Sequence, residues 1–230
     1  MNIAIILSGG NGTRLGGDIP KQYIMVAGKP IITYALRTFN EHEKVDGIVI
    51  VVAEEWKELL SEWIEKEEVT KFIGFAVAGS SRQQSIVNGM EKVYELGAKD
   101  EDSIIIHDAA RPNISAEAIS CCIEALSQAD GVMPALPIKD TVYLSENGKN
   151  IKSLLNRDHL FAGQAPESFK LGKYYVIQKD MSSEELCKVR GSSEIAFQHG
   201  LSISIVQGDE HNYKITTMAD LDKFKREMEK

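Results

Sequence analysis

Short apolar runs alternate with amphipathic segments along the first 136 residues of the chain. The runs, most of them rich in Ile and Val, lie at 3–7, 47–52, 72–77, 103–107 and 131–136. The segments between them, at 30–40, 54–66, 81–96 and 115–128, repeat apolar residues at helical spacing. Repeated strand–helix–strand order predicts an α/β fold, with a mostly parallel sheet flanked by helices and its strands buried on both faces.

Ligand chemistry is expected at one edge of this sheet. In open α/β sheets, ligands bind outside the carboxyl ends of the strands, so the loops after the first and fourth runs should carry reactive residues. Beyond the fifth run, 170–199 is predicted to be helical, 201–208 to be a strand and 216–230 to be a closing helix. No repeat or low-complexity linker interrupts the chain, so residues 1–230 are expected to form a single domain.

The alternation breaks at "DTVYLSENGKNIKSLL" (140–155), where two roughly alternating runs flank an Asn-Gly pair. Asn-Gly between such runs favours a β-hairpin. A hairpin that projects from the sheet exposes strand edges and apolar side chains such as Leu144 and Ile151. We therefore expect residues 139–157 to form a dimerisation arm that a second copy of the chain covers. The alternative is a hairpin folded onto its own domain.

The composition, with 43% hydrophobic and 26% charged residues, is typical of a globular protein. A formal net charge of −8 argues against a nucleic-acid partner, which requires a basic face, but a small anionic substrate needs only a few local cations. The first apolar run stops at Leu7, too short for a signal peptide or a membrane span, so a cytoplasmic location without a membrane partner is expected. The three cysteines lack zinc-site spacing.

A glycine-rich loop, "LSGGNGTRLGGDIPKQY" (7–23), follows the first predicted strand. A turn of this kind can aim several backbone N–H groups at one phosphate. The P-loop pattern fails, because Gly12 is followed by Thr13 and Arg14 instead of Lys-Ser or Lys-Thr. The dinucleotide pattern is weak, because Leu15 takes the place of its third glycine and no acidic residue ends the second strand.

A third pattern, Gly-Gly-x-Gly-x-Arg-x-Gly followed by Pro-Lys, matches the loop and resembles the phosphate loop of sugar nucleotidyltransferases. It is met at Gly9, Gly10, Gly12, Arg14, Gly16, Pro20 and Lys21. Joining a phosphate to the α-phosphorus of a nucleoside triphosphate brings two anions together, so fixed cations that meet the developing charge are the main source of catalysis. A phosphate nucleophile is already largely ionised at neutral pH, so no general base is required.

From these residues the chain resembles, nearly end to end, the CDP-alcohol-forming cytidylyltransferases, which include the methylerythritol phosphate and ribitol phosphate enzymes. The resemblance rests on six blocks: "GGNGTRLGGDIPKQY", "GSSRQQSIVNGM" (79–90), "HDAARP" (107–112), "IKDTV" (138–142), "NRDHLFAGQAPESF" (156–169) and "NYKITTMADL" (212–221). It implies a Rossmann-like, GT-A-like nucleotidyltransferase sheet that transfers CMP from CTP to a sugar-alcohol phosphate with Mg²⁺, in a homodimer.

The resemblance also implies roles for particular residues. Arg14 and Lys21 would be the catalytic cations. The nucleotide would be bound by Ser8, Gly9, Gly10, Gly12, Gly79, Ser80, Ser85 and Ala109. Asp108 would hold Mg²⁺. The acceptor phosphate would be bound by Arg111, Thr141, Arg157 and Lys214, and because Thr141 and Arg157 flank the arm, these two would serve the neighbouring subunit's site.

Besides Ser8-Gly9-Gly10, which stands where the methylerythritol phosphate enzymes usually have Ala-Ala-Gly, two stretches depart from the family pattern. "GQAPESF" (163–169) replaces the usual Gln-Thr-Pro-Gln, and "VRGSSEIAFQHG" (189–200) stands where a Thr-Asp-Asp/Ala stretch is expected. Because the second stretch helps to shape the acceptor side, the acceptor stays open: 2-C-methyl-D-erythritol 4-phosphate is favoured, with ribitol 5-phosphate or another polyol phosphate as the alternative. Two further functions are kept as alternatives, namely a catalytically inactive nucleotide-binding relative and a nicotinamide-dependent oxidoreductase.

Overall fold

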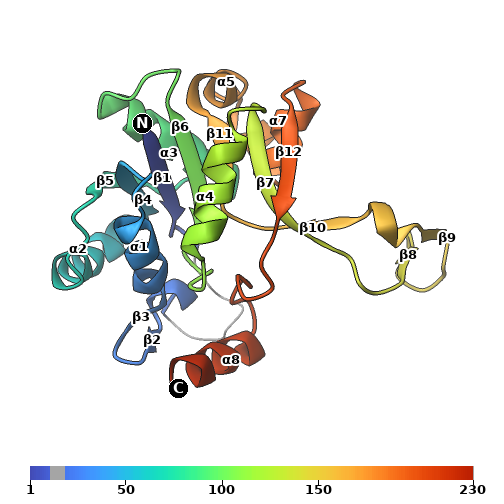
Figure 1. The fold of residues 1–230 in the computed structure, drawn as a ribbon, viewed down its shortest axis with the longest axis horizontal. Helices are drawn as coiled ribbons and strands as arrows, with labels where there is room; N and C mark the ends of the chain where they lie inside the picture. Colours follow the sequence, from blue (N-terminus) through green and yellow to red (C-terminus); the bar gives the residue numbers. More distant parts are fainter. Residues whose placement is uncertain (11–18, 230) are drawn as a thin grey trace.

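The computed structural model describes residues 1–10 and 19–229 and builds them around one eight-stranded sheet (Figure 1). The strands are β1 (Asn2–Leu7), β4 (Gly47–Val52), β5 (Phe72–Val77), β6 (Ser103–Asp108), β7 (Gly131–Pro137), β10 (Phe161–Gly163), β11 (Glu167–Lys170) and β12 (Ile203–Gln207). Their order is β10-β7-β11-β6-β1-β4-β5, and β12 pairs with β7. The predicted α/β fold is confirmed.

Most neighbouring strands run parallel, as the strand–helix alternation predicts. β1 pairs in parallel with β4 and β6, β4 with β5, and β7 with β12. β11 is antiparallel to both β6 and β7, and β10 is antiparallel to β7. β5 lies at the end of the sheet, where only Ala76 of its six residues is buried. The expectation that 72–77 is buried on both faces is therefore wrong, because an edge strand is covered less completely.

Helices cover both faces of the sheet (Figure 1). The α-helices are α1 (Ile31–Glu41), α2 (Lys57–Lys66), α3 (Arg82–Glu95), α4 (Ala116–Ala125), α5 (Leu171–Val176), α6 (Ser183–Lys188), α7 (Ser192–Gln198) and α8 (Met218–Met228). Ile5 of β1 packs in a core with α3, α5, α6 and α7, whereas Ile6 packs in a second core with α1, α2 and α4. This alternation follows from the two-residue period of a strand.

Hydroxyl caps fix the starts of four helices. Ser81, Ser115, Ser182 and Thr217 each accept a hydrogen bond from a backbone N–H in the first turn, at the starts of α3, α4, α6 and α8. In the part of the chain that the structure describes, no helix has both the length and the apolar character needed to cross a membrane.

The predicted hairpin is confirmed. β8 (Val142–Leu144) pairs antiparallel with β9 (Ser153–Leu155), and Figure 1 shows this pair standing out from the body of the molecule beyond β10. Its apolar side chains face solvent: Ile151 is 67% exposed and Leu154 64%. The short 3₁₀ helix η4 (Arg157–His159) leads the chain back to β10. The role of this arm in a dimer stays a prediction.

The predicted helical stretch at 170–199 is only partly right. It divides into α5, α6 and α7, with breaks at 177–182 and 189–191. The antiparallel strands β10 and β11 were not predicted, because each is three or four residues long and shows no alternation of its own. Two further short strands, β2 (Met25–Val26) and β3 (Lys29–Pro30), form a small hairpin, and the 3₁₀ helices η2 (Lys21–Tyr23) and η3 (Glu54–Trp56) precede β2 and α2.

Candidate functional site

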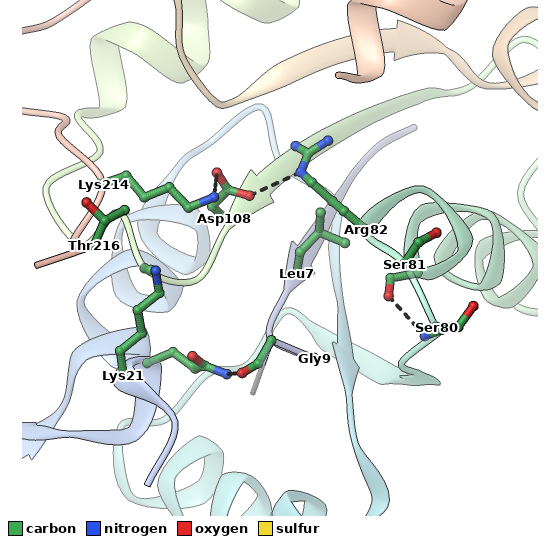
Figure 2. Close-up of a pocket in the computed structure, with 14 residues that line it drawn as sticks. Leu7, Gly9, Lys21, Ser80, Ser81, Arg82, Asp108, Lys214 and Thr216 are labelled. Atoms are coloured by element: carbon green, nitrogen blue, oxygen red, sulfur yellow. Dashed lines mark hydrogen bonds and ion pairs between the residues drawn. The ribbon is translucent and has the colours of Figure 1, made fainter. Parts of the chain in front are cut away.

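A cavity of about 670 Å³ opens at the carboxyl ends of β1 and β6. This is the edge at which the sheet topology predicts ligand binding, and the volume suits a small molecule. Predicted site residues among its described lining are Gly9, Gly10, Lys21, Gly79, Ser80, Ser85, Asp108 and Lys214. Figure 2 shows Lys214 and Asp108 on one side of this cavity and Gly9 on another.

Several predicted residues lie outside this lining. Ser8 and Ala109 are buried behind it, where the Ala109 N–H donates to the Leu7 carbonyl at 3.1 Å. The neighbouring Ala110, rather than Ala109, lines the cavity. Thr141 is exposed at the base of the arm.

Three other predicted cations have different outcomes. Arg111 lies beside Asp108, and Arg157 is held on the arm side, where its Nη1 donates to the Lys139 carbonyl at 2.6 Å. Gly12 and Arg14 lie outside the described residues. The structure therefore places Lys21 but does not bear on its predicted partner.

Asp108 is the centre of a cluster of cations. Its Oδ2 accepts from Lys214 Nζ at 2.9 Å and lies 3.5 Å from Arg111 Nε, while its Oδ1 lies 3.4 Å from Arg82 Nε. Figure 2 shows the carboxylate between Lys214 and Arg82. Burial alone would raise the pKa of Asp108, but Arg82, Lys214 and Arg111 together hold it well below its usual range. The carboxylate is therefore ionised at neutral pH.

Backbone and side-chain contacts fix this cluster from behind. The Ile215 N–H donates to the Ala110 carbonyl at 2.9 Å, which brings the Lys214 segment beside the end of β6. His107 Nε2 lies 3.0 Å from the Arg111 carbonyl, and burial lowers the pKa of His107 to about 4. His107 is thus neutral at neutral pH and holds the turn that carries Arg111, which is a structural role.

Two side chains after the loop fix the backbone of its described part. Gln22 Nε2 donates to the carbonyls of Ser8 and Gly10 at 2.7 and 2.9 Å. Tyr23 Oη lies 2.7 Å from Ser8 Oγ, and its ring stacks on Trp56. Because both carbonyls point at Gln22, the peptide planes that follow Ser8 and Gly10 are fixed. Such fixed main-chain amides are the basis of an anion-binding nest.

The opposite wall begins with a second tight turn. Gly79 N–H donates to Ser85 Oγ at 3.0 Å, and a Cβ at Gly79 would lie 2.4 Å from Gln84 Cγ. A Cβ at Gly9 would lie 2.4 Å from Ala78 Cβ. Gly9 is therefore needed where the loops after β1 and β5 approach each other, and Gly79 where its own turn closes onto the start of α3. Because Ser85 Oγ accepts the Gly79 bond, its own proton remains able to reach a ligand.

With the described residues as its protein ligands, a metal ion held here would also need ligands from a substrate. In residues 1–10 and 19–229, no group of three His, Cys, Asp or Glu side chains gathers as a self-contained metal site would require. Among the described lining residues, Asp108 alone carries a carboxylate. Mg²⁺ is often bound by one carboxylate plus substrate phosphates and waters. An ionised Asp108 beside a cavity large enough for a phosphorylated substrate therefore fits that ion.

Sequence reasoning missed four residues of the site. Arg82 and Gln22 line the cavity, and Glu167 and Ser192 contact Arg82 from behind. Arg82 and Gln22 each stand inside a block that resembles the family, so both could have been found there. Glu167 and Ser192 stand in the two departing stretches, and only the fold brings them together.

The match to known proteins runs nearly end to end. A model of the IspD family, described as 2-C-methyl-D-erythritol 4-phosphate cytidylyltransferase, matches residues 2–229. A ribitol-5-phosphate cytidylyltransferase of Streptococcus agalactiae serotype Ia is 32% identical over 226 residues, which cover 98% of this chain and 94% of that protein. A 2-C-methyl-D-erythritol 4-phosphate cytidylyltransferase of Lachnospira eligens is 34% identical over 227 residues, which cover 96% of each.

The fold is also that of solved structures. A crystal structure of 4-diphosphocytidyl-2C-methyl-D-erythritol synthase aligns with a TM-score of 0.79 at 27% identity, covering 99% of this chain and 98% of that one.

Proposed function

The chain belongs to the IspD family of CTP-dependent cytidylyltransferases, and on that premise we propose that it transfers CMP from CTP to the phosphate of a sugar alcohol. The products are a CDP-alcohol and pyrophosphate. The observation that carries the proposal is the convergence of Lys21, Lys214 and Arg82 with fixed main-chain turns on one cavity. Membership of this family removes the nicotinamide-dependent oxidoreductase as an alternative. Because CTP is a cytoplasmic metabolite, we also propose a cytoplasmic location.

The proposed chemistry is an in-line displacement at the α-phosphorus of CTP. An oxygen of the acceptor phosphate forms a bond to that phosphorus, and the bond to the β-phosphate bridging oxygen breaks to release pyrophosphate. Lys21 and the main-chain amides of the loop that follows β1 meet the charge that develops on the triphosphate. Lys214 and Arg111 lie where they can hold the second anion beside Asp108. The acceptor needs no base, because its phosphate is already ionised.

We propose that Asp108 holds Mg²⁺ against the triphosphate. The ion, when bound, supplies charge neutralisation between phosphate oxygens. Asp108 is kept ionised by its cationic neighbours, and among the described residues its Oδ1 is contacted by Arg82 at a long 3.4 Å. Oδ1 is therefore the oxygen that could coordinate the ion with the smaller loss of existing contacts.

Two acceptors are supported by different observations. The family model is described for 2-C-methyl-D-erythritol 4-phosphate, which we propose as the acceptor and, with it, a role in isoprenoid precursor synthesis. The second candidate is ribitol 5-phosphate, the substrate in the name of the Streptococcus agalactiae relative, which matches this chain at nearly the same identity as the Lachnospira eligens protein. A CDP-ribitol product would serve cell-surface polymer synthesis.

An acceptor panel tests the proposal. The purified protein is incubated with CTP, Mg²⁺ and each of several alcohol phosphates, and pyrophosphate release is recorded. We expect release with 2-C-methyl-D-erythritol 4-phosphate to exceed that with ribitol 5-phosphate in kcat/KM. The reverse order would assign the second acceptor. Binding of CTP without turnover on any acceptor would instead favour an inactive nucleotide-binding relative.

The loop clamp provides a prediction for CTP binding. We expect Gln22→Glu to weaken CTP binding by about tenfold, because a carboxylate cannot donate to the Ser8 and Gly10 carbonyls and repels them. Titration calorimetry with CTP and Mg²⁺ measures this, with the exposed Gln128→Glu as the matched control. An unchanged CTP affinity in Gln22→Glu would show that the clamp does not set the loop for binding.

We propose that the arm joins two subunits and that Arg157 and Thr141 serve the partner's site. Both residues stand outside the described lining of their own cavity, at the base of an arm whose apolar side chains face solvent. A second copy of the chain would cover these side chains. It would also bring Arg157 to the partner's anion-binding cavity, whose own subunit does not place Arg157 in the described lining. Residues 139–157 would then be part of the active site as well as of the interface.

Mixing two impaired variants tests this sharing of sites. We expect Arg157→Ala to raise KM for the acceptor by about tenfold or more while CTP binding changes little, so activity is compared at an acceptor concentration well below KM. Denaturing and refolding Arg157→Ala together with Lys21→Ala should restore about a quarter of wild-type activity, because half of the dimers are mixed and each mixed dimer has one intact site. If Arg157 served its own subunit, every mixed dimer would carry two defective sites and the mixture would be no more active than the two variants apart.

A further inference from the structure

The two stretches that depart from the family pattern contact each other in the fold. Glu167 begins β11, in the first departing stretch, and Ser192 and Ser193 begin α7, in the second. Glu167 Oε2 accepts from the Ser193 N–H at 2.9 Å and from Ser193 Oγ at 2.6 Å. Glu167 is 8% exposed and Ser192 is fully buried. The two departures are therefore one buried polar unit.

This unit holds Arg82, whose guanidinium reaches the cavity wall. Arg82 Nη1 donates to Ser192 Oγ at 2.6 Å, and Arg82 Nη2 lies 3.4 Å from Glu167 Oε1. On its other side, Arg82 Nε lies 3.4 Å from Asp108 Oδ1. The guanidinium is thus equidistant from two carboxylates, one inside the cavity and one behind it.

Ser192 is itself held in place by a chain of hydrogen bonds. Its carbonyl accepts from Tyr174 Oη at 3.2 Å, and Tyr174 Oη accepts from Gln83 Nε2 at 3.0 Å. Tyr174 is fully buried and stacks on Phe169. The acceptor of the short hydrogen bond from Arg82 is therefore on a residue whose backbone is fixed. A shift of the guanidinium toward Asp108 would lengthen that hydrogen bond.

Charge decides what this arrangement does to Asp108. Asp108 already has Lys214 at 2.9 Å and Arg111 at 3.5 Å on Oδ2. A third cation drawn fully onto Oδ1 would close the carboxylate to any other cation. A second carboxylate behind Arg82 attracts the guanidinium in the opposite direction, and in a buried setting that attraction is strong.

We propose that Glu167, with Ser192, is a positioning residue that keeps Arg82 shared between two carboxylates and so leaves Asp108 Oδ1 open to a magnesium ion. The proposed positioning of Arg82 depends only on its contacts with Glu167, Ser192 and Asp108. Its consequence for magnesium rests on the proposed function. On this account the departing stretches preserve the site, since the carboxylate on β11 and the serines on α7 together hold the arginine.

Glu167→Gln tests the proposal with little change of shape. The glutamine keeps an oxygen for the two Ser193 donors but loses the charge that attracts Arg82. In ligand-free protein with ¹⁵N-labelled arginine, we expect hydrogen exchange of the Arg82 Nε–H to slow about threefold or more, because the guanidinium closes on Asp108. Equal exchange in wild type and Glu167→Gln would overturn the positioning of Arg82, whatever the protein does with CTP.

The magnesium consequence is measured by CTP calorimetry with and without Mg²⁺. We expect the gain in CTP affinity on adding Mg²⁺ to shrink about fivefold in Glu167→Gln. In an Arg82→Gln background, Glu167→Gln should have no further effect on this gain, because the positioned group is absent. An equal effect in both backgrounds would mean that Glu167 acts by its field and not through Arg82, which would overturn the proposal.

A matched control and the wild-type titration separate the two levels of the proposal. Glu41→Gln makes the same chemical change in the exposed Arg37–Glu41 pair of α1 and should leave CTP binding unchanged. If wild type bound no CTP, the proposed function would fail, while the exchange of the Arg82 Nε–H would still decide whether Glu167 positions Arg82. A Glu167→Gln protein that matched wild type in both measurements would leave Glu167 only the role of fastening α7 to β11.

Discussion

Lys21→Ala is expected to lower kcat by about two to four orders of magnitude while the protein stays folded. Lys21 begins η2 and lines the cavity opposite Lys214 and Asp108 (Figure 2). Its charge should act mainly when the triphosphate gains negative charge in the transition state, so CTP affinity should fall much less than turnover. Lys21 is only partly buried, and the hydrogen bonds of Gln22 and Tyr23 to the Ser8 carbonyl remain to hold η2 when the lysine side chain is removed.

Pyrophosphate release at saturating CTP and acceptor measures this effect, and thermal unfolding checks the fold. Lys44→Ala is the matched control. Lys44 pairs with Glu124 on the surface, and neither residue is part of the described lining of the cavity. A Lys21→Ala protein whose kcat stayed within tenfold of wild type would contradict the assignment of Lys21 as a catalytic cation.

Asp108→Asn is expected to have the second large effect, on both activity and stability. Loss of the carboxylate should lower kcat/KM by about two orders of magnitude or more and remove most of the Mg²⁺ dependence of CTP binding. It also leaves Arg82, Arg111 and Lys214 without their common anion. We expect the free energy of unfolding to fall by about 2 kcal/mol, below the range for fully buried pairs, because the side chains of Arg82 and Lys214 are 32% and 36% exposed.

Two measurements check this prediction independently. Denaturant unfolding gives the stability of Asp108→Asn, and calorimetry with CTP in the presence and absence of Mg²⁺ gives the metal dependence. Asp130→Asn is a useful comparison, because Asp130 also pairs with lysines but lies away from the described lining of the cavity. If Asp108→Asn kept the full gain in CTP affinity from Mg²⁺, another group would have to hold the ion.

The sheet could be predicted from the sequence where its strands are long and buried. β1, β4 and β6 are six-residue runs whose burial on both faces removes any need for polar residues, so hydrophobicity alone marks them. β10 and β11 could not be found in this way. They are held by pairing with β7 and β6, partners far away in sequence, and short strands stabilised by such pairing carry little local pattern.

The residues of the site fall into the same two groups: those that a local sequence pattern marks and those that only the fold brings together. Glycines and cations in contiguous blocks could be assigned from the sequence, because tight turns and phosphate binding require those residue types locally. The approach of Lys214 to Asp108, 106 positions apart in the sequence, depends on the folded sheet and was reached only through resemblance to a family. Glu167 was beyond both routes, because a buried acid is meaningful only once its cation, Arg82, is seen beside it.

The proposed convergence of cations and main-chain amides on a triphosphate is tested most directly by a crystal structure with CTP and Mg²⁺. We predict that the triphosphate lies in the cavity against the backbone N–H groups around Gly9 and Gly10, with Lys21 Nζ within hydrogen-bond distance of a phosphate oxygen and Asp108 next to the metal ion. CTP bound at another place, or bound in the cavity with Lys21 turned away into solvent, would contradict the proposed function.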